Sequence, residues 1–346
     1  MSTTRVTIAD VARLAGVSQG AVSFALNNRP GVAADTRDRI LRAAQDLGYT
    51  PSHRARALAA SRALALGLVI ARPPETLGAD PFFPLFIAGI ESALSPLGQS
   101  LLLHVVPDRD RELDRYRHLA ADGRVDGVFL TDLRVQDPRP ALLDEIGLPA
   151  VWIGPECTDE SRPCVAVDDR PGIAAVVAHL AELGHRVVAH VAGPTQFIHG
   201  LSRREAWERA LVDAGLPPGP CITADFSAQG GADATKVLLD LPEPPTAIVF
   251  ANDLMAIAGM AVASARGLEV PRDLSVTGFD DTEVSAHLQP PLTTVSTDAF
   301  GWGQAAARRL LDVVEGRPGR NVSLPPPHLV IRASTAPPPP DERPQP

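Results

Sequence analysis

The stretch from Thr7 to Asn27, TIADVARLAGVSQGAVSFALN, constrains the fold more than any other part of the chain. Thr7 and Asp10 are spaced as a capping pair, Gly16 is a residue that ends helices, and Ser18 is suited to cap a second helix. Apolar residues at helical spacing on both sides of the glycine predict two short helices joined by a tight turn, a helix-turn-helix. On spacing alone, the alternative is an ordinary helical hairpin in a small core.

A third helix is predicted from about Ala34 to Leu47, and Gly48 ends it. Residues 1–50 therefore make an all-α head of three short helices, whose third helix is expected to bury Ile40, Leu41, Ala44 and Leu47. Residues 52–61 are prone to helix but hold few large apolar groups. A segment with so little to bury is expected to stay disordered or marginal until something orders it.

Charge is distributed unevenly along the chain. The whole sequence of 346 residues has a formal net charge of −9, yet residues 1–62 carry nine arginines against four acidic residues, a net charge of +5, which leaves −14 for the remainder. A basic head on an acidic body is the asymmetry expected when only the head meets phosphates.

Cysteine usage and the lack of long apolar runs suggest where the protein works. Cys157, Cys164 and Cys221 form no metal-like or redox-like spacing, so reduced, mostly structural thiols are expected. No apolar run approaches the roughly 20 residues needed to span a bilayer, and the N-terminus lacks a signal-peptide pattern. We therefore predict a cytoplasmic protein.

From Ala65 onward, short apolar strands alternate with amphipathic helices. Such alternation predicts parallel sheets with helices on both faces, and the number of strands suits two doubly wound lobes better than one sheet. The chain closes with strands at Thr293–Ser296 and His328–Ile331 and a helix at Gly301–Val314 between them, followed by a proline-rich tail, 336–346, that is expected to be disordered.

Motifs along nearly the whole chain resemble the lactose-repressor/galactose-repressor family of bacterial transcription regulators. The head stretch is followed by GVAADTRDRILRAAQDLGYTPSHRARALA, and the body contains HLAELGHRVVAHVAGP, SRREAW, AIVFANDLMAIAGMAVASARGLEVPRDLSVTGFDD and PPLTTVSTD in that family's order. The resemblance covers about residues 5–333. It implies a head that binds DNA, a hinge helix, and a two-lobed body like a periplasmic sugar-binding protein.

The resemblance also implies domain boundaries and partners. The helix-turn-helix domain would span 1–50, the hinge helix 51–63 and the effector-binding and dimerisation body 64–335. In that body, the first lobe would comprise about 64–163 and 293–324, and the second about 164–292 and 325–335. The family binds partly palindromic operators as homodimers and responds to a small effector in the cleft between the lobes. The family's tetramer-forming leucine repeat is absent, so a dimer is expected.

In the head, the second helix would enter the major groove of the operator. The family often has arginine where this chain has Phe24, and an apolar ring cannot read a guanine edge, so the half-site should differ at that base. In the hinge, a leucine would wedge into the minor groove between flanking arginines. The residues expected at DNA are Thr7, Ser18, Gln19, Gly20, Ser23, Phe24 and Asn27 in the head, and Arg54, Arg56 and Leu58 in the hinge.

In the body, polar residues should face the cleft at strand ends, where doubly wound sheets bind ligands. Arg203 and Asp280 match the family's effector-contacting arginine and aspartate, whereas Gly154 stands where some members have a carboxylate. For each candidate the alternative is structural: a surface salt bridge, a turn residue or core packing. The expected effector-binding residues are Phe82, Phe83, Thr131, Asp132, Arg203, Phe226, Asn252 and Asp280.

Two other classes of function are compatible with parts of the sequence. An enzyme could use Asp253, Asp280 and Asp281 as a glycosidase-like carboxylate set, or histidines 104, 179, 185, 190 and 199 as metal ligands. The histidine spacings match no metal signature, and no nucleophile elbow, P-loop or dinucleotide fingerprint is present. A solute receptor would fit the body alone, but the basic head and missing signal peptide oppose it.

The sequence therefore predicts a repressor that binds double-stranded operator DNA as a homodimer, with no cofactor and no membrane partner. Its effector is expected to be a sugar, with a purine or another small polar metabolite as the alternative. The effector would act by shifting an equilibrium between two lobe arrangements in proportion to its differential affinity for them. Whether it releases the operator or promotes its binding stays open.

Overall fold

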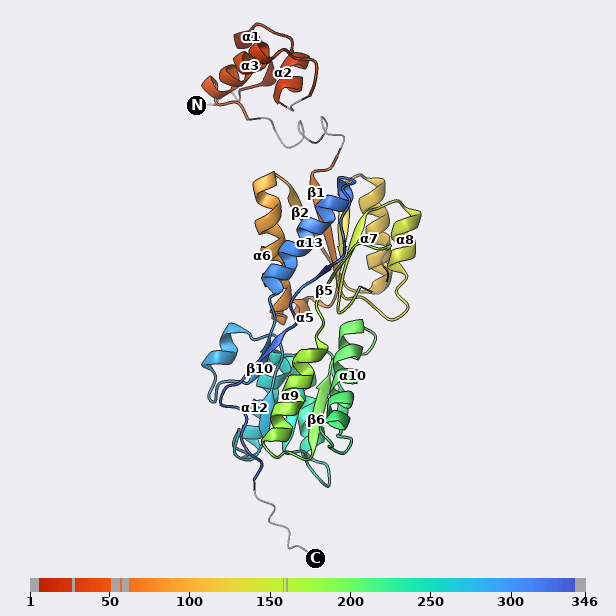
Figure 1. Cartoon of the computed structure of the whole chain (residues 1–346), viewed down its shortest axis with the longest axis vertical. Coiled ribbons are helices and arrows are strands. Elements are labelled where there is room, and N and C mark those ends of the chain that lie inside the picture. The colour runs from red at the N-terminus through yellow and green to blue at the C-terminus, as the bar shows by residue number, and fades with distance from the viewer. Residues whose placement is uncertain are drawn as a thin grey trace, which may run out of the picture.

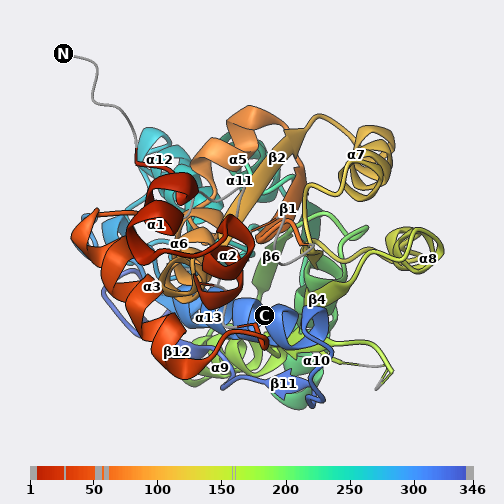
Figure 2. The ribbon, with the colours of Figure 1, turned by 90° about the horizontal axis from the view of Figure 1, so that it is seen from above.

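The computed structural model describes residues 6–26, 29–50, 57, 62–157, 159 and 161–339. A small helical head and two α/β lobes follow one another along the longest axis (Figure 1). Seen along that axis, the head lies over one side of the body (Figure 2). In the described residues, no helix is both long and apolar enough to cross a membrane.

The head has the predicted helix-turn-helix, made of α1 (Ile8–Ala15), α2 (Gln19–Leu26) and α3 (Ala34–Asp46). The Asp10 carboxylate accepts hydrogen bonds from the backbone N–H and the hydroxyl of Thr7, and Ser18 Oγ accepts one from the Ala21 N–H. Gly16 has a φ of 64°, which ends α1 in the left-handed conformation. Ile40 is fully buried in the head core, but Leu41 is 44% exposed, so its expected burial is wrong. Leu41 lies one residue beyond the buried stripe of α3.

The first lobe is built on a parallel sheet with the strand order β11-β5-β4-β3-β1-β2. Helices α6 and α13 cover one face of this sheet, and α7 and α8 cover the other. Successive side chains of a strand point to opposite faces, so apolar residues on both faces need such a cover. The strands are β1 (Ala65–Ala71), β2 (Ser100–Val106), β3 (Gly127–Leu130), β4 (Ala150–Gly154), β5 (Cys164–Ala166) and β11 (Val322–Ser323). The helices are α5 (Pro74–Ala79), α6 (Phe82–Leu94), α7 (Arg109–Ala121), α8 (Arg139–Glu145) and α13 (Ala299–Val314), with a 3₁₀ turn, η1, at Ser95–Leu97.

Two glycines allow α6 and α13 to cross in close contact. A Cβ added at Gly89 of α6 would lie 2.0 Å from the carbonyl oxygen of Phe300, and one at Gly303 of α13 would lie 2.1 Å from that of Phe86. Any larger residue at either position would therefore push the helices apart. This crossing places Phe82 and Trp302 side by side at the lower end of the lobe, with ring centroids 5.5 Å apart.

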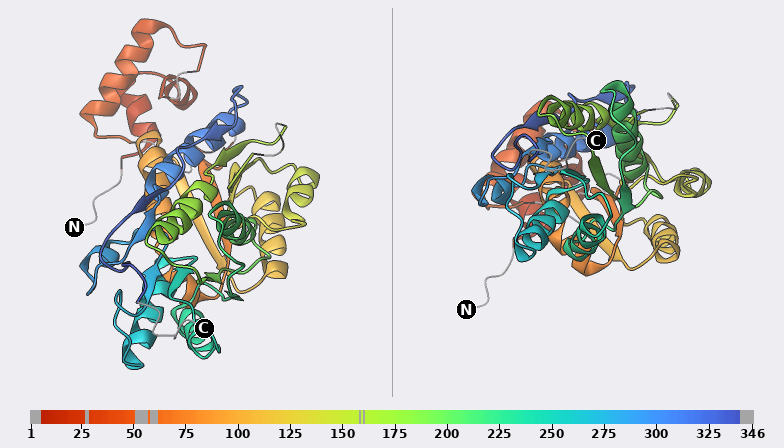
Figure 3. Two further views of the ribbon diagram at one scale, coloured as in Figure 1. Left: turned by 60° about the horizontal axis from the view of Figure 1, so that its bottom comes forward. Right: turned by 90° about the horizontal axis from the view of Figure 1, so that it is seen from below.

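The second lobe has a parallel sheet in the order β7-β6-β8-β9. Helices α9 and α10 pack on one face and α11 and α12 on the other (Figure 3). The strands are β6 (Val188–Ala192), β7 (Cys221–Thr223), β8 (Ala247–Phe250) and β9 (Ser275–Thr277). The helices are α9 (Arg170–Glu182), α10 (Ile198–Asp213), α11 (Ala228–Leu239) and α12 (Asp253–Ala265), with a 3₁₀ helix, η2, at Glu283–His287.

The lobe boundaries differ from those expected. β5 pairs with β4 and β11, so Cys164–Ala166 belongs to the first sheet although the second lobe was expected to begin at 164. β10 (Thr294–Ser296) pairs with β12 (His328–Val330), and bridges at Thr293 and Ser296 join this pair to the second sheet rather than the first. Strand pairing across a crossover decides lobe membership, and linear sequence does not reveal it.

Two further expectations about loops and ends differ from the structure. Cys157 and Cys164 form a disulfide across the β4–β5 loop, so the expectation of reduced thiols is wrong for this pair, whereas Cys221 is free. The loop returns the chain to the neighbouring strand, which brings the two cysteines together. The tail was expected to begin at 336, but the N–H of Ala336 donates to Ser275 Oγ. Residues 340–346 of that tail lie outside the described part.

Candidate functional site

A pocket lies between the two lobes, where the carboxyl ends of both parallel sheets face each other. This is the edge at which open α/β sheets bind ligands. About 740 Å³ of space lies inside it, part of it open to solvent. Its lining residues are Arg72, Asp80, Phe82, Thr131, Asp132, Ile153, Gly154, Pro155, Val167, Asp169, His199, Arg203, Phe226, Asn252, Asp280, Thr297 and Trp302.

Arg72 organises the first-lobe wall of the pocket. It follows β1 directly, and its Nε and Nη2 atoms each donate to a different carboxylate oxygen of Asp132 at 2.7 Å. Its Nη1 atom donates to Asp80 at 2.7 Å. Burial acts to raise the pKa of Asp132, but the adjacent guanidinium outweighs it and lowers that pKa, whereas for Asp80 burial prevails and the pKa is raised. Arg72 was not among the residues predicted from the sequence.

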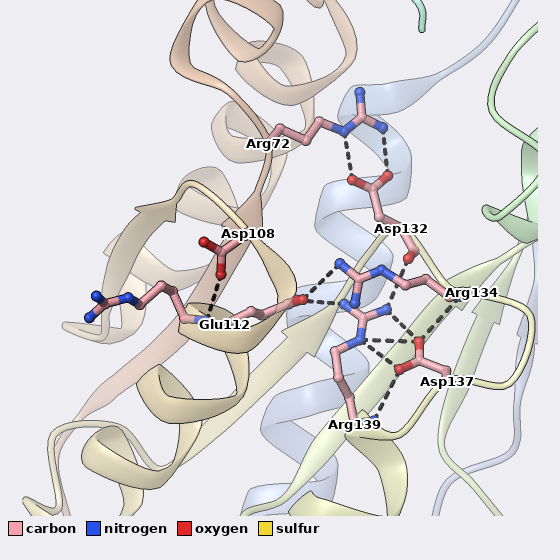
Figure 4. A network of polar contacts seen from close by, with 8 residues as sticks. Arg72, Asp108, Glu112, Asp132, Arg134, Asp137 and Arg139 are labelled. Carbon is pink, nitrogen blue, oxygen red and sulfur yellow. Dashed lines mark hydrogen bonds and ion pairs between the residues drawn. The ribbon is translucent and has the colours of Figure 1, made fainter.

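A buried network of ion pairs and hydrogen bonds holds the backbone of Asp132 in place (Figure 4). Arg139 donates to the carbonyl oxygen of Asp132 at 2.9 Å, to Glu112 at 2.8 Å and to both carboxylate oxygens of Asp137. Arg134 reaches the second oxygen of Glu112 at 2.7 Å. The groups come from α7, from the start of α8 and from the loop between β3 and α8, so the network fixes that loop in place.

Arg203 on α10 occupies the corresponding place in the second lobe. Its Nε donates to Asp169 at 2.7 Å and its Nη1 to the carbonyl oxygen of Ala251 at 2.8 Å, while the guanidinium carbon lies 3.6 Å from the centroid of the Phe279 ring. These contacts leave Nη2 without a partner among the described residues. Arg203 therefore has a fixed position and a donor still available in the pocket.

Asp280 lies at the base of the pocket, just after β9. Its carboxylate accepts no hydrogen bond from the described residues. Burial raises the pKa of Asp280 well above its usual value, although Arg203 acts in the opposite direction. Its φ of 115° is positive, as are those of the pocket residues Asp132 and Phe226, at 49° and 68°. Strained backbone of this kind collects at ligand-binding sites.

We expect Asp280→Asn to stabilise the ligand-free protein at pH 7. Because the pKa is raised on folding, Asp280 favours the folded state fully below its unfolded pKa, and this contribution is lost as the pH rises through the folded pKa. Removing the charge should recover about 1.4 kcal/mol per unit of pKa shift, and each kcal/mol raises the unfolding midpoint by roughly 2–4 °C in a domain of this size. Thermal unfolding from pH 4 to 8 measures both effects.

The adjacent Asp281 gives the matched control for that experiment. Its carboxylate is paired with Arg332 at 2.6 Å, so Asp281→Asn removes the same charge from a satisfied group and should lower the midpoint or leave it unchanged. A destabilised Asp280→Asn protein at pH 7 would contradict the assignment of Asp280 as an uncompensated carboxylate.

Aromatic rings form the apolar parts of the pocket wall. Phe82 and Trp302 come from the first lobe and Phe226 from the second. The His199 ring lies between Phe197 and Phe226, 5.5 Å from each centroid, and burial lowers its pKa to about 3, so the ring is neutral at pH 7. The indole N–H of Trp302 is buried and has no acceptor among the described residues.

The structure brings most of the predicted effector residues together. Phe82, Thr131, Asp132, Arg203, Phe226, Asn252 and Asp280 all line the pocket. Phe83 does not: it is buried in the first-lobe core, and its ring packs against Arg72. Asn252 also has a structural role, since its side chain caps α12 through the Met255 N–H and donates to the carbonyl oxygen of Phe226.

Of the positions Gly154 and Asp253, only the first lies in the pocket wall. Gly154 lines the pocket, and a Cβ there would lie 2.7 Å from the Leu133 side chain, so a carboxylate at this position would require that side chain to move. Asp253 does not line the pocket. Its buried carboxylate accepts hydrogen bonds from Thr282, Ser285 and Thr294, which makes it a structural residue and not part of a catalytic pair with Asp280.

The lobes contact each other directly beside the pocket. Val135 donates its N–H to the carbonyl oxygen of Gln196 at 3.1 Å, and Ile198 donates to that of Leu133 at 2.8 Å. Arg134 and Phe197 form an antiparallel bridge between these two bonds. The supported loop after β3 is therefore joined to the start of α10, and this contact must break if the lobes separate on that side.

The head presents the start and the outer face of α2 to solvent. Ser18, Gln19 and Gly20 are exposed, Phe24 is 42% exposed, and Ser23 is half-buried. The Phe24 ring lies against Gly31, with the Arg29 guanidinium carbon 6.0 Å from its centroid. Thr7 is exposed beside the start of α1. The predicted DNA contacts Asn27, Arg54, Arg56 and Leu58 lie outside the described residues.

No cluster of three or more histidine, cysteine, aspartate or glutamate side chains that could hold a metal is found in the part of the chain that the structure describes. Two of the five histidines proposed as ligands have other partners: His185 and His190 are buried in the second lobe, where His185 bonds to Thr246 and Ser275 and His190 to the carbonyl oxygen of Val249.

Comparison with protein families gives two matches. The model of bacterial regulatory proteins of the lacI family matches residues 7–52, and the model of a periplasmic binding protein-like domain matches residues 177–335. The first range covers the helical head, and the second runs from within α9 through the rest of the second lobe and includes α13 and β11 of the first lobe.

Individual relatives extend the similarity to the whole chain. The HTH-type transcriptional regulator CelR of Thermobifida fusca is 35% identical, with 95% of this chain and 98% of that protein covered. The structure of a CelR–cellobiose complex superposes with a TM-score of 0.73 at 34% identity, covering 95% of this chain and all of that one. The lac repressor dimer bound to operator and the anti-inducer ONPF gives a TM-score of 0.81 at 31% identity, covering 96% and 100%.

Proposed function

The chain belongs to the LacI family of bacterial regulatory proteins, and from this premise we propose that it is a repressor controlled by a sugar bound between its lobes. It is a DNA-binding transcriptional regulator, and the family consists of regulators and not of enzymes. Its partners are double-stranded operator DNA, a small effector and a second copy of the chain. We propose that it acts in the cytoplasm, where its operator lies.

The chemistry of the pocket supports a neutral, hydroxyl-rich effector. Its lining residues supply four carboxylates, Asp80, Asp132, Asp169 and Asp280, against the guanidinium groups of Arg72 and Arg203. This excess of negative charge opposes phosphorylated or carboxylated ligands, and the many acceptor oxygens suit a ligand with many O–H donors. Aromatic rings beside these acceptors provide apolar surface for the C–H faces of a sugar. The unpaired carboxylate of Asp280 carries this assignment furthest.

A purine is the second candidate for the effector. Its ring N–H groups could donate to Asp280, and its flat faces would suit Phe82, Trp302 and Phe226. The CelR–cellobiose complex concerns a relative with 34% identity and favours the sugar.

We infer a two-state mechanism from the position of the pocket. An effector contacting Arg72 and Asp132 in one lobe and Arg203 and Asp280 in the other binds differently when the lobes rotate relative to each other. The size of the shift in the lobe equilibrium is therefore set by the difference between the effector's affinities for the two arrangements. The bridge between Leu133–Val135 and Gln196–Ile198 is one set of contacts that such a rotation would change.

A thermal-shift screen of sugars and nucleobases on the full-length protein tests the effector class. The hit should then change the affinity of the protein for a palindromic DNA selected from a random library. A stabilising sugar that changes operator binding supports the proposal. A protein that selects no palindrome, or whose operator binding responds only to nucleobases, would contradict the repressor or the sugar assignment respectively.

We expect Phe24→Arg to change which half-site the protein prefers. An arginine on the exposed face of α2 can form a bidentate contact with guanine, worth about 1–3 kcal/mol of discrimination between base pairs, which a phenyl ring cannot. Selection of half-sites by wild-type and variant protein measures the change. Leu14→Arg is the control: Leu14 is exposed on α1, so this substitution adds the same charge to the head at a position away from α2. An unchanged preference in Phe24→Arg would show that this side chain does not face the bases.

A further inference from the structure

The junction at which the chain enters the body from the head is held by one carboxylate. Asp126, immediately before β3, accepts hydrogen bonds from two successive backbone amides, Ala63 N–H at 2.7 Å and Leu64 N–H at 2.9 Å. Its side chain is only 9% exposed and also lies 3.5 Å from Arg62 Nε. A buried carboxylate with two charge-assisted bonds to adjacent amides fixes the direction of the backbone there.

The backbone on either side of the junction is tied as well. The N–H of Arg62 donates to the carbonyl oxygen of Ala57, and the N–H of Ser100 on β2 donates to that of Leu64. Leu64 has a φ of 53°, in the left-handed region that costs a residue with a Cβ about 1 kcal/mol or more. Such a conformation persists only where surrounding contacts impose it, and Asp126 supplies two of those contacts.

Strands β1 and β3 connect this junction with the pocket. β1 lies between Leu64 and Arg72, and β3 begins directly after Asp126 and ends two residues before Asp132. The strands are paired, with Leu66 opposite Gly127 and Leu68 opposite Phe129. At one end the strands are joined by Asp126 and the Ala63 and Leu64 amides, and at the other by the paired Arg72 and Asp132. At about 3.3 Å per residue, the eight steps from Leu64 to Arg72 place these ends roughly 26 Å apart.

We propose that Asp126 is a positioning residue for operator binding: it fixes where and in which direction the chain leaves the body toward the DNA-binding head. In a homodimer, two such junctions set the separation of the two heads. Loss of the carboxylate leaves the heads and the pocket intact but lets the separation vary. This inference rests on the proposed function, because it presumes an operator read by two heads.

The test compares full-length wild-type protein with Asp126→Asn on two DNAs: the palindrome that the wild type selects, and the same palindrome with one base pair inserted at its centre. Asparagine offers one acceptor oxygen in place of two and sets an NH₂ group against an amide donor. We expect about tenfold weaker binding of the selected palindrome. The loss in affinity caused by the insertion should shrink, because heads that are less firmly placed tolerate either spacing.

The spacing readout separates positioning from charge and from stability. Removing an acid from the DNA-facing end should by itself strengthen DNA binding, so weaker binding has the opposite sign to the electrostatic effect. Asp114→Asn measures the effect of losing one acid from the same lobe without a change at the junction, since Asp114 is an exposed residue of α7 paired with Arg117. A variant that merely unfolds in part would lose affinity for both DNAs equally and would also lose its thermal shift with the hit of the sugar screen.

Asp126→Glu is the second variant, and it covers the case in which Asp126→Asn does not fold. It keeps the charge and moves the acceptor oxygens by one methylene, so the discrimination between the two spacings should fall while nonspecific DNA binding is unchanged. Wild-type discrimination in a folded variant would overturn the proposal. Failure of the wild-type protein to select any palindrome would instead refute the proposed function, before the variants are compared.

Discussion

Arg203→Met should weaken binding of the effector by about 100-fold or more, with operator binding in its absence unchanged. The substitution removes the available Nη2 donor and leaves Asp169 buried with its partner lost. A hydrogen bond from a charged donor contributes about 1.5–3 kcal/mol, and 2.8 kcal/mol corresponds to roughly 100-fold in a dissociation constant. Calorimetric titration with the hit of the sugar screen measures the loss, and operator binding in a sugar series shows whether the response is lost with it.

The neighbouring Arg204 provides the matched control. It lies on the same helix, is exposed and is paired with Glu208 four residues along, a contact worth at most about 0.5 kcal/mol. Arg204→Met should therefore bind the sugar within about twofold of wild type. Arg203→Lys should fail nearly as badly as methionine, because one ammonium cannot reach Asp169 and the Ala251 carbonyl in the fixed geometry of a guanidinium. Tight sugar binding by Arg203→Met would place the effector elsewhere.

Much of the fold could be predicted because local pattern and final structure agree. The capping residues Thr7 and Ser18 and the glycine turn between them mark the two helices of the head, and the structure has those caps and that turn. The strands that alternate with helices in the body are continuous apolar runs, as expected for parallel sheets covered on both faces. Such features depend on neighbours in sequence, which a single sequence contains.

The pocket could be predicted in part for the same reason. Arg203, Asn252 and Asp280 stand in family motifs, and all three line the pocket. Arg72 and Asp169 carry no such signal. They became visible only when the sheets placed Arg72 beside Asp132, 60 residues away, and Asp169 beside Arg203, 34 residues away.

The wrong predictions concern the direction of a side chain and the pairing of strands. Phe82 and Phe83 are the first two residues of α6, and a helical turn of 100° per residue directs the Phe83 ring to the core and the Phe82 ring to the pocket. The Cys157–Cys164 disulfide and the placement of β5 and β10 depend on which strands pair, which is a property of the whole sheet. Pairing across crossovers is the information that the linear pattern lacks.

Arg72→Met is expected to destabilise the folded protein by about 3–5 kcal/mol, because it leaves two buried carboxylates, Asp80 and Asp132, without their shared cation. In a domain of 150–250 residues this corresponds to a fall of roughly 10 °C in the midpoint of thermal unfolding. Arg117→Met is the control: Arg117 is paired with the exposed Asp114 on the surface of the same lobe, and its loss should cost well under 1 kcal/mol.

The pH dependence distinguishes lost charge pairing from lost packing in that variant. In the wild type the pKa of Asp132 is lowered, so its contribution to stability is present above the unfolded pKa and is lost as the pH falls through the folded pKa. Without Arg72, burial becomes the largest influence on Asp132, opposed only by the weaker effects of His199 and Arg139, so we expect its pKa to rise and the sign of that contribution to reverse. The difference in stability between wild type and Arg72→Met should therefore narrow as the pH falls from 7 toward 4. If it stays constant over that range, Arg72 contributes through its packing against Phe83, Phe197 and Phe226 and not through its charge.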